Sequence, residues 1–274
     1  MKVGIHLGVP EEDYHKLEYA SSSTLGKLIR SPAHLIASRQ QDDSSRSEAF
    51  KLGSAVHSII LEPESWLDLW GKGIEGDRRT KIVKEKWNRL YKKYGKNQVL
   101  TAKQYDACLA IRDAIDNHST AKALLWSEGE SEVTLIWDDP ATGVRCKARI
   151  DRLPAKASWG IVDLKTTKDA GRKAFGKSLW AYGYYRQAAH YLNGLRVLGE
   201  PRRHFTFCCV EKEKPFGVAV YRIDEGSVDA GEMQVARLLQ TYKTCEETGF
   251  WPAYPDEIQD ISIPPWAFPE IDKE

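Results

Sequence analysis

The chain has 274 residues, 42% of them hydrophobic, which is enough to bury a sizeable core and excludes the collagen-like, disordered and disulfide-scaffold classes. Its 40 Lys and Arg residues nearly balance its 39 Asp and Glu residues, so the net charge is +1 and any attraction to a polyanion must come from a local basic surface. No uncharged run reaches the roughly 18 residues of a membrane helix, and residues 1–9 lack the apolar stretch of a signal peptide, so we expect a cytoplasmic protein without membrane contact.

Helical periodicity dominates the first half of the chain. It predicts four helices, over residues 22–30, 52–61, 80–94 and 102–118. Ser21 to Ser23 are N-cap candidates for the first helix, and Ser31-Pro32 ends it. Residues 72–103 carry eleven Lys or Arg residues and three acids, so this segment is either a solvated helix face or a contact for phosphate groups.

Near residue 130 the pattern changes to short β-rich runs separated by turn residues. We predict strands over residues 132–137, 144–151, 160–166, 203–210 and 217–223, and helices over residues 177–195 and 227–248. No repeat or flexible linker divides the chain, so we expect a single domain. It would comprise a mainly helical part over residues 1–130, a βββαββα core over 131–250 and a Pro-rich acidic tail over 251–274.

The five cysteines form no C-x-x-C pair, which argues against a disulfide framework and a zinc knuckle. Cys208 and Cys209 are adjacent and no three-cysteine C-terminal cluster exists, which argues against an iron–sulfur cluster. We expect all of them to be reduced core residues.

The residues that point to chemistry lie on the second and third predicted strands. Asp151 ends one strand, and Asp163-Leu164-Lys165 lies near the end of the next. Strand alternation places Asp163 and Lys165 on one face and Leu164 on the other. If the two strands form a hairpin, two carboxylates and a lysine converge. Hard oxygen ligands suit Mg²⁺ or Mn²⁺. A neighbouring lysine would orient or help deprotonate a metal-bound water, and it would stabilise negative charge on the phosphate.

This pattern resembles the PD-(D/E)XK nuclease superfamily, in particular the RecE (exonuclease VIII) and RecB-like branch. The similarity runs from about residue 14 to about residue 221. One departure is Arg149-Ile150 where an apolar residue and a proline usually precede the first carboxylate. The matching motifs are Ser21-Ser22-Ser23-Thr24-Leu25, Gly53 to His57 with Leu61-Glu62-Pro63, Glu132, Asp151, Asp163-Leu164-Lys165, and Gln187 to Tyr191.

The resemblance implies a restriction-endonuclease-like α/β fold, with a central mixed sheet, helices on both sides and an N-terminal helical layer. It implies a metal site made of His57, Asp151, Asp163 and the backbone carbonyl of Leu164, with Lys165 acting on the nucleophilic water. The remaining implied residues are Glu132 at the edge of the metal site, Gln187 and Tyr191 bracing the catalytic strand or touching DNA, and Ser22, Ser23 and Arg30 holding a 5′-phosphate.

The function that follows from the resemblance is a Mg²⁺-dependent deoxyribonuclease, with Mn²⁺ as a substitute. It would be a 5′-to-3′ exonuclease acting on double-stranded DNA ends in a bacterial or phage-infected cell, producing 3′ overhangs for recombination. The family also implies a ring-shaped homo-oligomer and a single-strand annealing protein as partner. The alternatives are an endonuclease or single-strand nuclease of the same fold, and a DNA-binding module without catalysis.

Several of these residues also have ordinary structural interpretations. His57 could be a hydrogen-bonded core histidine, Gln187 a cap for a buried backbone group, and Tyr191 a core side chain. Trp66 and Trp70 lie four residues apart beside the basic segment, so they are either core residues or a wedge for terminal bases.

Overall fold

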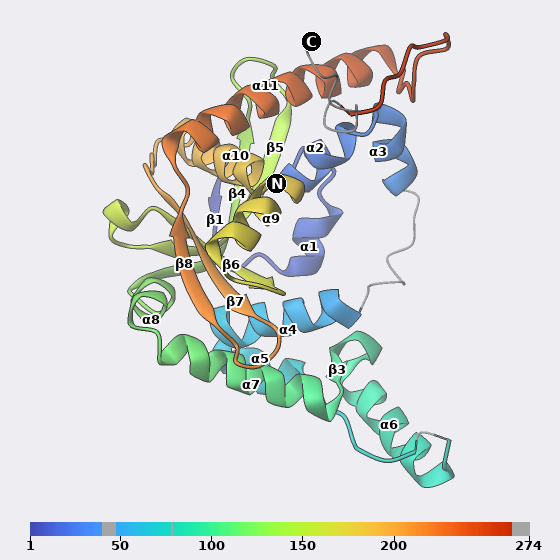
Figure 1. The fold of residues 1–274 in the computed structure, drawn as a ribbon, viewed down its shortest axis with the longest axis vertical. Coiled ribbons are helices and arrows are strands. Elements are labelled where there is room, and N and C mark those ends of the chain that lie inside the picture. The colour runs from blue at the N-terminus through green and yellow to red at the C-terminus, as the bar shows by residue number, and fades with distance from the viewer. Residues whose placement is uncertain (40–47, 78, 265–274) are drawn as a thin grey trace, which may run out of the picture.

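A computed structural model describes residues 1–39, 48–77 and 79–264 of the chain (Figure 1). Its centre is a six-stranded mixed sheet with the strand order β1-β4-β5-β6-β7-β8. The strands are β1 (Gly4–His6), β4 (Gly129–Asp138), β5 (Arg145–Pro154), β6 (Ile161–Thr167), β7 (Phe205–Glu211) and β8 (Val218–Arg222). Strands β6 and β7 pair in parallel, and every other neighbouring pair in the sheet is antiparallel.

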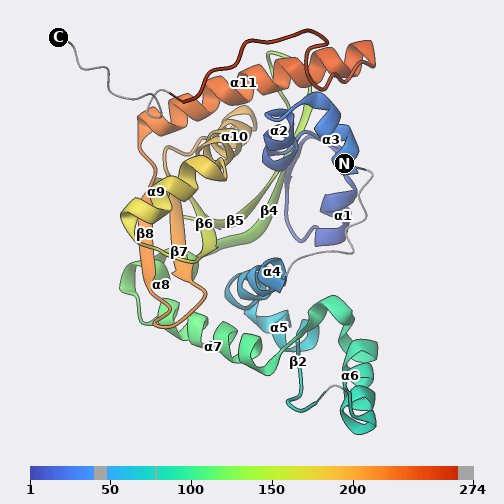
Figure 2. The same ribbon diagram turned by 45° about the vertical axis from the view of Figure 1, so that its right-hand side comes forward.

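Helices cover both faces of this sheet (Figures 1 and 2). One face carries α2 (Ser22–Leu28), α3 (Pro32–Arg39), α9 (Arg172–Ala181), α10 (Tyr184–Val197) and α11 (Glu225–Thr248). The other carries α4 (Glu48–Leu61), α5 (Pro63–Leu69), α7 (Ala102–Asp116) and α8 (Ser119–Leu125). The expected α/β fold, with a mixed sheet flanked by helices, is confirmed.

The remaining elements lie around this core. Helix α1 (Glu11–Lys16) follows β1, and short 3₁₀ turns cover Lys96–Gln98 and Ala157–Trp159. Helix α6 (Lys81–Tyr94) extends away from the sheet in both ribbon views, next to the small parallel pair β2 (Gly71–Lys72) and β3 (Val99–Leu100).

Alternation along the central strands separates two hydrophobic cores. On β7, Phe207 and Cys209 pack toward α9 and α10, while Cys208 and Val210 pack toward α4 and α7. The adjacent cysteines therefore point to opposite faces of the sheet. As expected, all five cysteines are free and buried.

The prediction of one helix over residues 177–195 is wrong. Two helices, α9 and α10, meet at Gly183, whose φ of 69° lies in the left-handed region that glycine adopts without strain. A Cβ atom at this position would lie 2.0 Å from the guanidinium of Arg186. The hydrophobic pattern continues through the break, which is why periodicity alone does not reveal it.

Two further differences concern strand ends. Strand β1 is only three residues long, yet it forms the edge of the main sheet by pairing with β4. Strand β5 continues to Pro154, so the prediction that Asp151 ends this strand is wrong.

The predicted N-cap at Ser21 is confirmed, because its side chain accepts a hydrogen bond from the backbone N–H of Thr24 at 3.2 Å.

The last part of the chain lies along α11 and α3 without forming a helix or strand up to residue 264. Its contacts include the Pro252 carbonyl, which accepts a hydrogen bond from Ala33, and the Trp251 ring, which meets Tyr242 edge-on. The rest of the predicted acidic tail, residues 265–274, lies outside the described residues. In the described part of the chain, no helix combines the length and apolar character needed to span a bilayer.

Candidate active site

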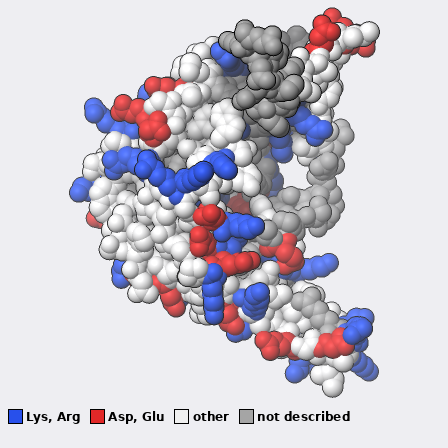
Figure 3. Space-filling view, in the orientation of Figure 1, with Lys and Arg blue, Asp and Glu red and all other residues white. Residues whose placement is uncertain are grey.

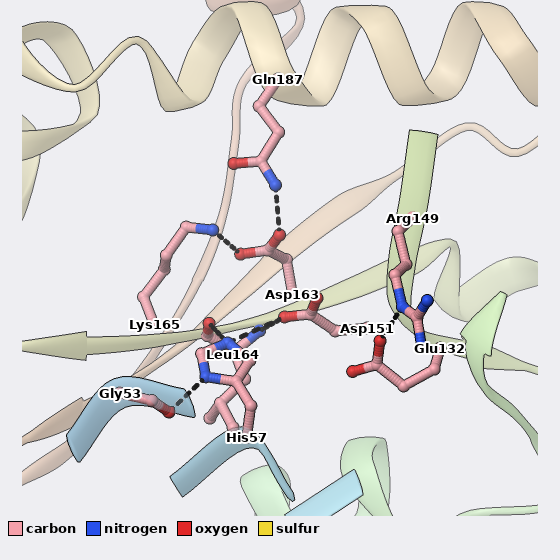
Figure 4. A network of polar contacts seen from close by, with 9 residues as sticks. All are labelled: Gly53, His57, Glu132, Arg149, Asp151, Asp163, Leu164, Lys165 and Gln187. Atoms are coloured by element: carbon pink, nitrogen blue, oxygen red, sulfur yellow. Dashed lines mark hydrogen bonds and ion pairs between the residues drawn. The ribbon is translucent and has the colours of Figure 1, made fainter. Parts of the chain in front are cut away.

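The residues singled out on the second and third predicted strands lie side by side on β5 and β6, between α4 and α10 (Figure 4). The two strands pair at Arg152 and Val162. Next to this pair, Asp151 Oδ2 accepts a hydrogen bond from the backbone N–H of Leu164 at 2.8 Å. A carboxylate thus binds the backbone of the neighbouring strand directly, which fixes its position relative to β6.

His57 reaches the same point from α4. Its Nδ1 lies 2.9 Å from the carbonyl oxygen of Gly53, and its Nε2 lies 2.8 Å from the Leu164 carbonyl oxygen and 3.4 Å from Asp151 Oδ2. Both ring nitrogens therefore face acceptors, as in the imidazolium form. Burial alone would lower the pKa of His57, but the hydrogen bond and negative charge of Asp151 outweigh it and raise the pKa to about 9.

The Asp163 side chain extends from β6 toward α10, on the other side of the sheet from α4, which carries His57. The Asp163 side chain is 1% exposed, Oδ1 accepts a hydrogen bond from Gln187 Nε2 at 2.7 Å, and Oδ2 forms an ion pair with Lys165. Burial raises the pKa of Asp163 to about 6, and the negative charge of Asp151 adds to this against the opposing effect of Lys165.

Lys165 is held as a cation. Burial would lower the pKa of Lys165, but the carboxylates of Asp163 and Asp151 outweigh it and raise that pKa above its ordinary value. The ammonium also lies 4.6 Å from the centre of the Tyr184 ring, within cation–π range. In this state Lys165 has no free lone pair to accept a proton, and its chemistry is that of a positive charge beside the two carboxylates.

Glu132 lies at the edge of the cluster and pairs with Arg149 of β5. Burial and the charge of Asp151 raise the pKa of Glu132 to about 7, although Arg149 opposes the shift. Arg149 also donates to the Val9 carbonyl at 3.0 Å. This pair ties the segment after β1 to the acidic cluster, and Glu132 is turned toward Arg149 instead of toward Lys165 or His57 (Figure 4).

The remaining predicted site residues differ in where they lie. Tyr191 is buried beside the cluster, and its ring packs against Phe205 with ring centroids 6.2 Å apart. Burial, Tyr14 and the negative charges of Asp163 and Asp151 raise the pKa of Tyr191, and a hydrogen bond with Gln187 opposes this. Ser22 and Ser23 lie in the first turn of α2, and Arg30 is exposed beyond its end. Within the described residues, no hydrogen bond or ion pair connects these two serines or Arg30 to the acidic cluster.

Of the two alternatives for Trp66 and Trp70, the structure supports core residues and contradicts the wedge. Both side chains are buried, and Trp66 Nε1 donates to the Ala55 carbonyl at 3.1 Å. Tyr184, in contrast, is a site residue that the motifs did not include. The signal was its position three residues before Gln187, which places both side chains on one face of the helix.

The donor atoms around the cluster fit a hard divalent cation. His57 Nε2, Asp151 Oδ2 and the Leu164 carbonyl oxygen converge on one point, and an imidazolium proton already provides positive charge there. Asp163 Oδ2 is buried and, apart from its ion pair with Lys165, accepts no hydrogen bond from the described residues. No three His, Cys, Asp or Glu side chains in the described ranges form a preassembled metal centre, so the backbone carbonyl is needed to complete the set.

Comparisons with known proteins identify the family and the fold. A family described as a PDDEXK-like domain of unknown function (DUF3799) matches residues 21–262. The crystal structure of a candidate exonuclease from Eubacterium rectale is similar to this chain with a TM-score of 0.57, at 17% identity, over 94% of this chain and 97% of its own. A phage-related exonuclease from Haemophilus somnus matches at 13% identity over 85% of this chain and 96% of its own, but its TM-score of 0.36 does not establish a common fold. No curated protein matches the chain.

Proposed function

The chain belongs to the PDDEXK-like family DUF3799, and from this premise we propose that it is a metal-dependent exodeoxyribonuclease. Its fold is that of the PDDEXK-like nucleases. The observation that carries the proposal is the convergence of Asp151, His57 and the Leu164 carbonyl next to the buried Asp163 and Lys165 pair. This combines a hard-cation site with a fixed positive charge, which is what hydrolysis of a phosphodiester requires.

In the proposed mechanism, His57, Asp151, Asp163 and the carbonyl of Leu164 hold a Mg²⁺ ion, and Mn²⁺ can replace it. When bound, such an ion supplies Lewis-acid polarisation of the phosphodiester and a more acidic water molecule. His57 must give up a proton to act as a ligand. Asp163 must be ionised for the same reason, and the hydrogen bond from Gln187 favours its ionised form.

Lys165 acts as a cation in this mechanism. Its ammonium is positioned by Asp163 and by the Tyr184 ring, so it can orient the attacking water by hydrogen bonding and stabilise negative charge that develops on the phosphate oxygens.

We propose double-stranded DNA ends as the substrate, degraded from 5′ to 3′ to leave 3′ overhangs for recombination. The resemblance to RecE-like enzymes supports this direction, and the Eubacterium rectale structure, described as that of a candidate exonuclease, supports the nuclease fold alone. We further propose that the chain is a single nuclease domain that acts in the cytoplasm as a ring-shaped homo-oligomer. Its partner would be a single-strand annealing protein. Ser22, Ser23 and Arg30 would contact the 5′-phosphate of the DNA.

The test uses linear duplex DNA labelled at the 5′ or the 3′ end, together with a covalently closed circular duplex. In Mg²⁺, early release of the 5′ label with an intact circle is the expected result, and EDTA should stop the reaction. Nicking of the circle would show an endonuclease instead. If wild-type protein cleaves no DNA in Mg²⁺ or Mn²⁺ while it still binds DNA, the chain is a binding module and the proposal is wrong.

A further inference from the structure

Two aromatic side chains at the junction of α9 and α10 are directed to solvent. Trp180, near the end of α9, is 72% exposed, and Tyr182, in the connection, is 69% exposed. Large aromatic rings normally bury most of their area, as Trp66 and Trp137 do in this protein. Exposed aromatic rings are the platforms on which proteins stack the bases of single-stranded nucleic acid.

The Trp180 ring is held in place by its neighbours. It stacks on Tyr185 with a centroid distance of 5.4 Å and an interplanar angle of 10°. The Tyr185 hydroxyl is fixed in turn by a hydrogen bond to Gln234 of α11 and by Arg186, whose Nη1 donates to it at 3.2 Å. With one face of the indole stacked on an anchored ring and the side chain largely exposed, its outer face is free for a further stacking partner.

Tyr182 connects this surface to the proposed active site. Its ring lies 5.6 Å from that of Tyr184, and the Lys165 ammonium lies 4.6 Å from the centre of the Tyr184 ring. Tyr184 is packed between Phe175 and Phe207 in the core, so it cannot easily move. The exposed rings therefore keep a fixed position relative to Lys165.

The charge around these rings matches a polyanion. From residue 170 to residue 199 the sequence has five Lys or Arg residues and no Asp or Glu. Arg172, Lys173 and Lys177 of α9 are exposed. Figure 3 shows a band of Lys and Arg side chains across the part of the surface where α9 lies in Figure 1. Exposed aromatic rings within a basic strip are the combination that binds single-stranded nucleic acid.

We propose that Trp180 and Tyr182 form a stacking surface for unpaired nucleobases of a DNA strand whose backbone reaches Lys165. Only an unpaired or terminal base offers an open face to an aromatic ring, so the occupant is single-stranded DNA or the frayed end of a duplex. The inference rests on the proposed nuclease function, because it assigns the substrate strand of that same site.

The test measures binding in EDTA, where no cleavage occurs. The two ligands are a fluorescent 5′-phosphorylated oligothymidylate of about 12 nucleotides and an abasic strand of the same length, which has the same phosphates without bases. Wild-type protein should bind the base-bearing strand about tenfold more tightly. The double variant Trp180→Ala, Tyr182→Ala should lose this preference while its affinity for the abasic strand stays unchanged.

Two controls separate stacking from loss of folding. Trp180→Phe with Tyr182→Phe keeps the rings and should keep most of the preference. Phe250→Ala removes another exposed aromatic ring, located just beyond the end of α11, and should have no effect. Equal affinity of the wild type for both strands, or a preference that survives in the double alanine variant, would overturn the inference. Neither result depends on cleavage, so the nuclease proposal is judged separately by the degradation of linear duplex DNA.

Discussion

The Nε2 atom of His57 lies 2.8 Å from the carbonyl oxygen of Leu164, although 107 residues separate them in the sequence. This contact joins α4 to β6 at the position where we propose a metal ion. In the metal-free protein the imidazolium proton provides the positive charge at this position. Binding of an ion should therefore be coupled to release of that proton.

The first prediction concerns this proton. With the pKa of His57 at about 9, the ring is protonated at pH 7, and a histidine ligand must be neutral. Mn²⁺ binding at pH 7 should release close to one proton per ion, and the release should fall toward zero as the pH rises above about 9. Calorimetric titrations in buffers of different ionisation enthalpy measure this number directly.

His57→Gln is the matched variant for that experiment, because glutamine keeps a polar group but cannot titrate. It should bind Mn²⁺ more weakly and without proton release at pH 7. Proton release that is unchanged in this variant would show that another group supplies the proton.

The second prediction concerns the acid side of the pH profile. Asp163, with a pKa of about 6, has to be ionised, so kcat/KM at limiting metal, which already falls below pH 9 because of His57, should fall more steeply as the pH drops through about 6. Gln187→Ala removes a hydrogen bond that favours the ionised carboxylate, so the midpoint should move up by roughly one unit. Asn193→Ala, on the same helix but bonded to Arg196, should leave the midpoint unchanged.

The third prediction concerns Lys165. Lys165→Met keeps the length of the side chain and removes its charge, so cleavage should fall about 10³-fold if the ammonium stabilises the transition state. In this variant Asp163 loses the neighbouring cation, so the pKa of Asp163 rises. The assay is therefore made at about pH 8.5, where Asp163 stays ionised. DNA affinity in EDTA should stay within roughly twofold of the wild type.

Lys156→Met is the control for Lys165. Lys156 lies before the first residue of β6, whereas Lys165 lies near its last residue, and the Lys156 ammonium is 5.4 Å from the centre of the Trp159 ring. The activity of this control variant should equal that of the wild type. If Lys165→Met cleaved DNA at the normal rate, the ammonium would have no role in the chemical step.

The fourth prediction concerns α6. Lys81, Lys84 and Lys92 are exposed on this helix, which extends away from the sheet. If they contact phosphates of duplex DNA, changing all three to Gln should reduce the slope of log K against log salt by about three. Arg237→Gln with Lys243→Gln on α11 removes charge elsewhere and should leave the slope unchanged. An unaltered slope in the α6 variant would identify α6 as a solvated face.

The sequence was most informative where the signal is local. The alternation of Asp163, Leu164 and Lys165 on one strand determines which side chains share a face, and the structure has the Asp163 and Lys165 side chains in contact. The α/β architecture followed from periodicity and from the ordered motifs. The break at Gly183 was not visible, because the apolar positions of α9 and α10 continue a single helical pattern across it.

Other features depend on tertiary contacts that no local pattern encodes. Strand β1 is too short for its periodicity to be read, and its pairing with β4 depends on residues more than 120 positions away. The local sequence does not tell that Trp180 is exposed and Trp66 buried, since both lie on short helices in which apolar and polar residues alternate without a clear period. The same limit applies to Glu132, whose pairing with Arg149 depends on the register of β4 and β5.

The proposed ligands come from different layers of the molecule, since His57 belongs to α4 on one face of the sheet and Asp163 is braced by α10 on the other. A bound ion would therefore connect a peripheral helix to the central sheet. Amide hydrogen exchange should report this as slower exchange in α4 when Mn²⁺ is added, with little change in α10. The catalytic ion would then determine how often α4 opens locally, and metal availability would set the susceptibility of this part of the protein to proteolysis.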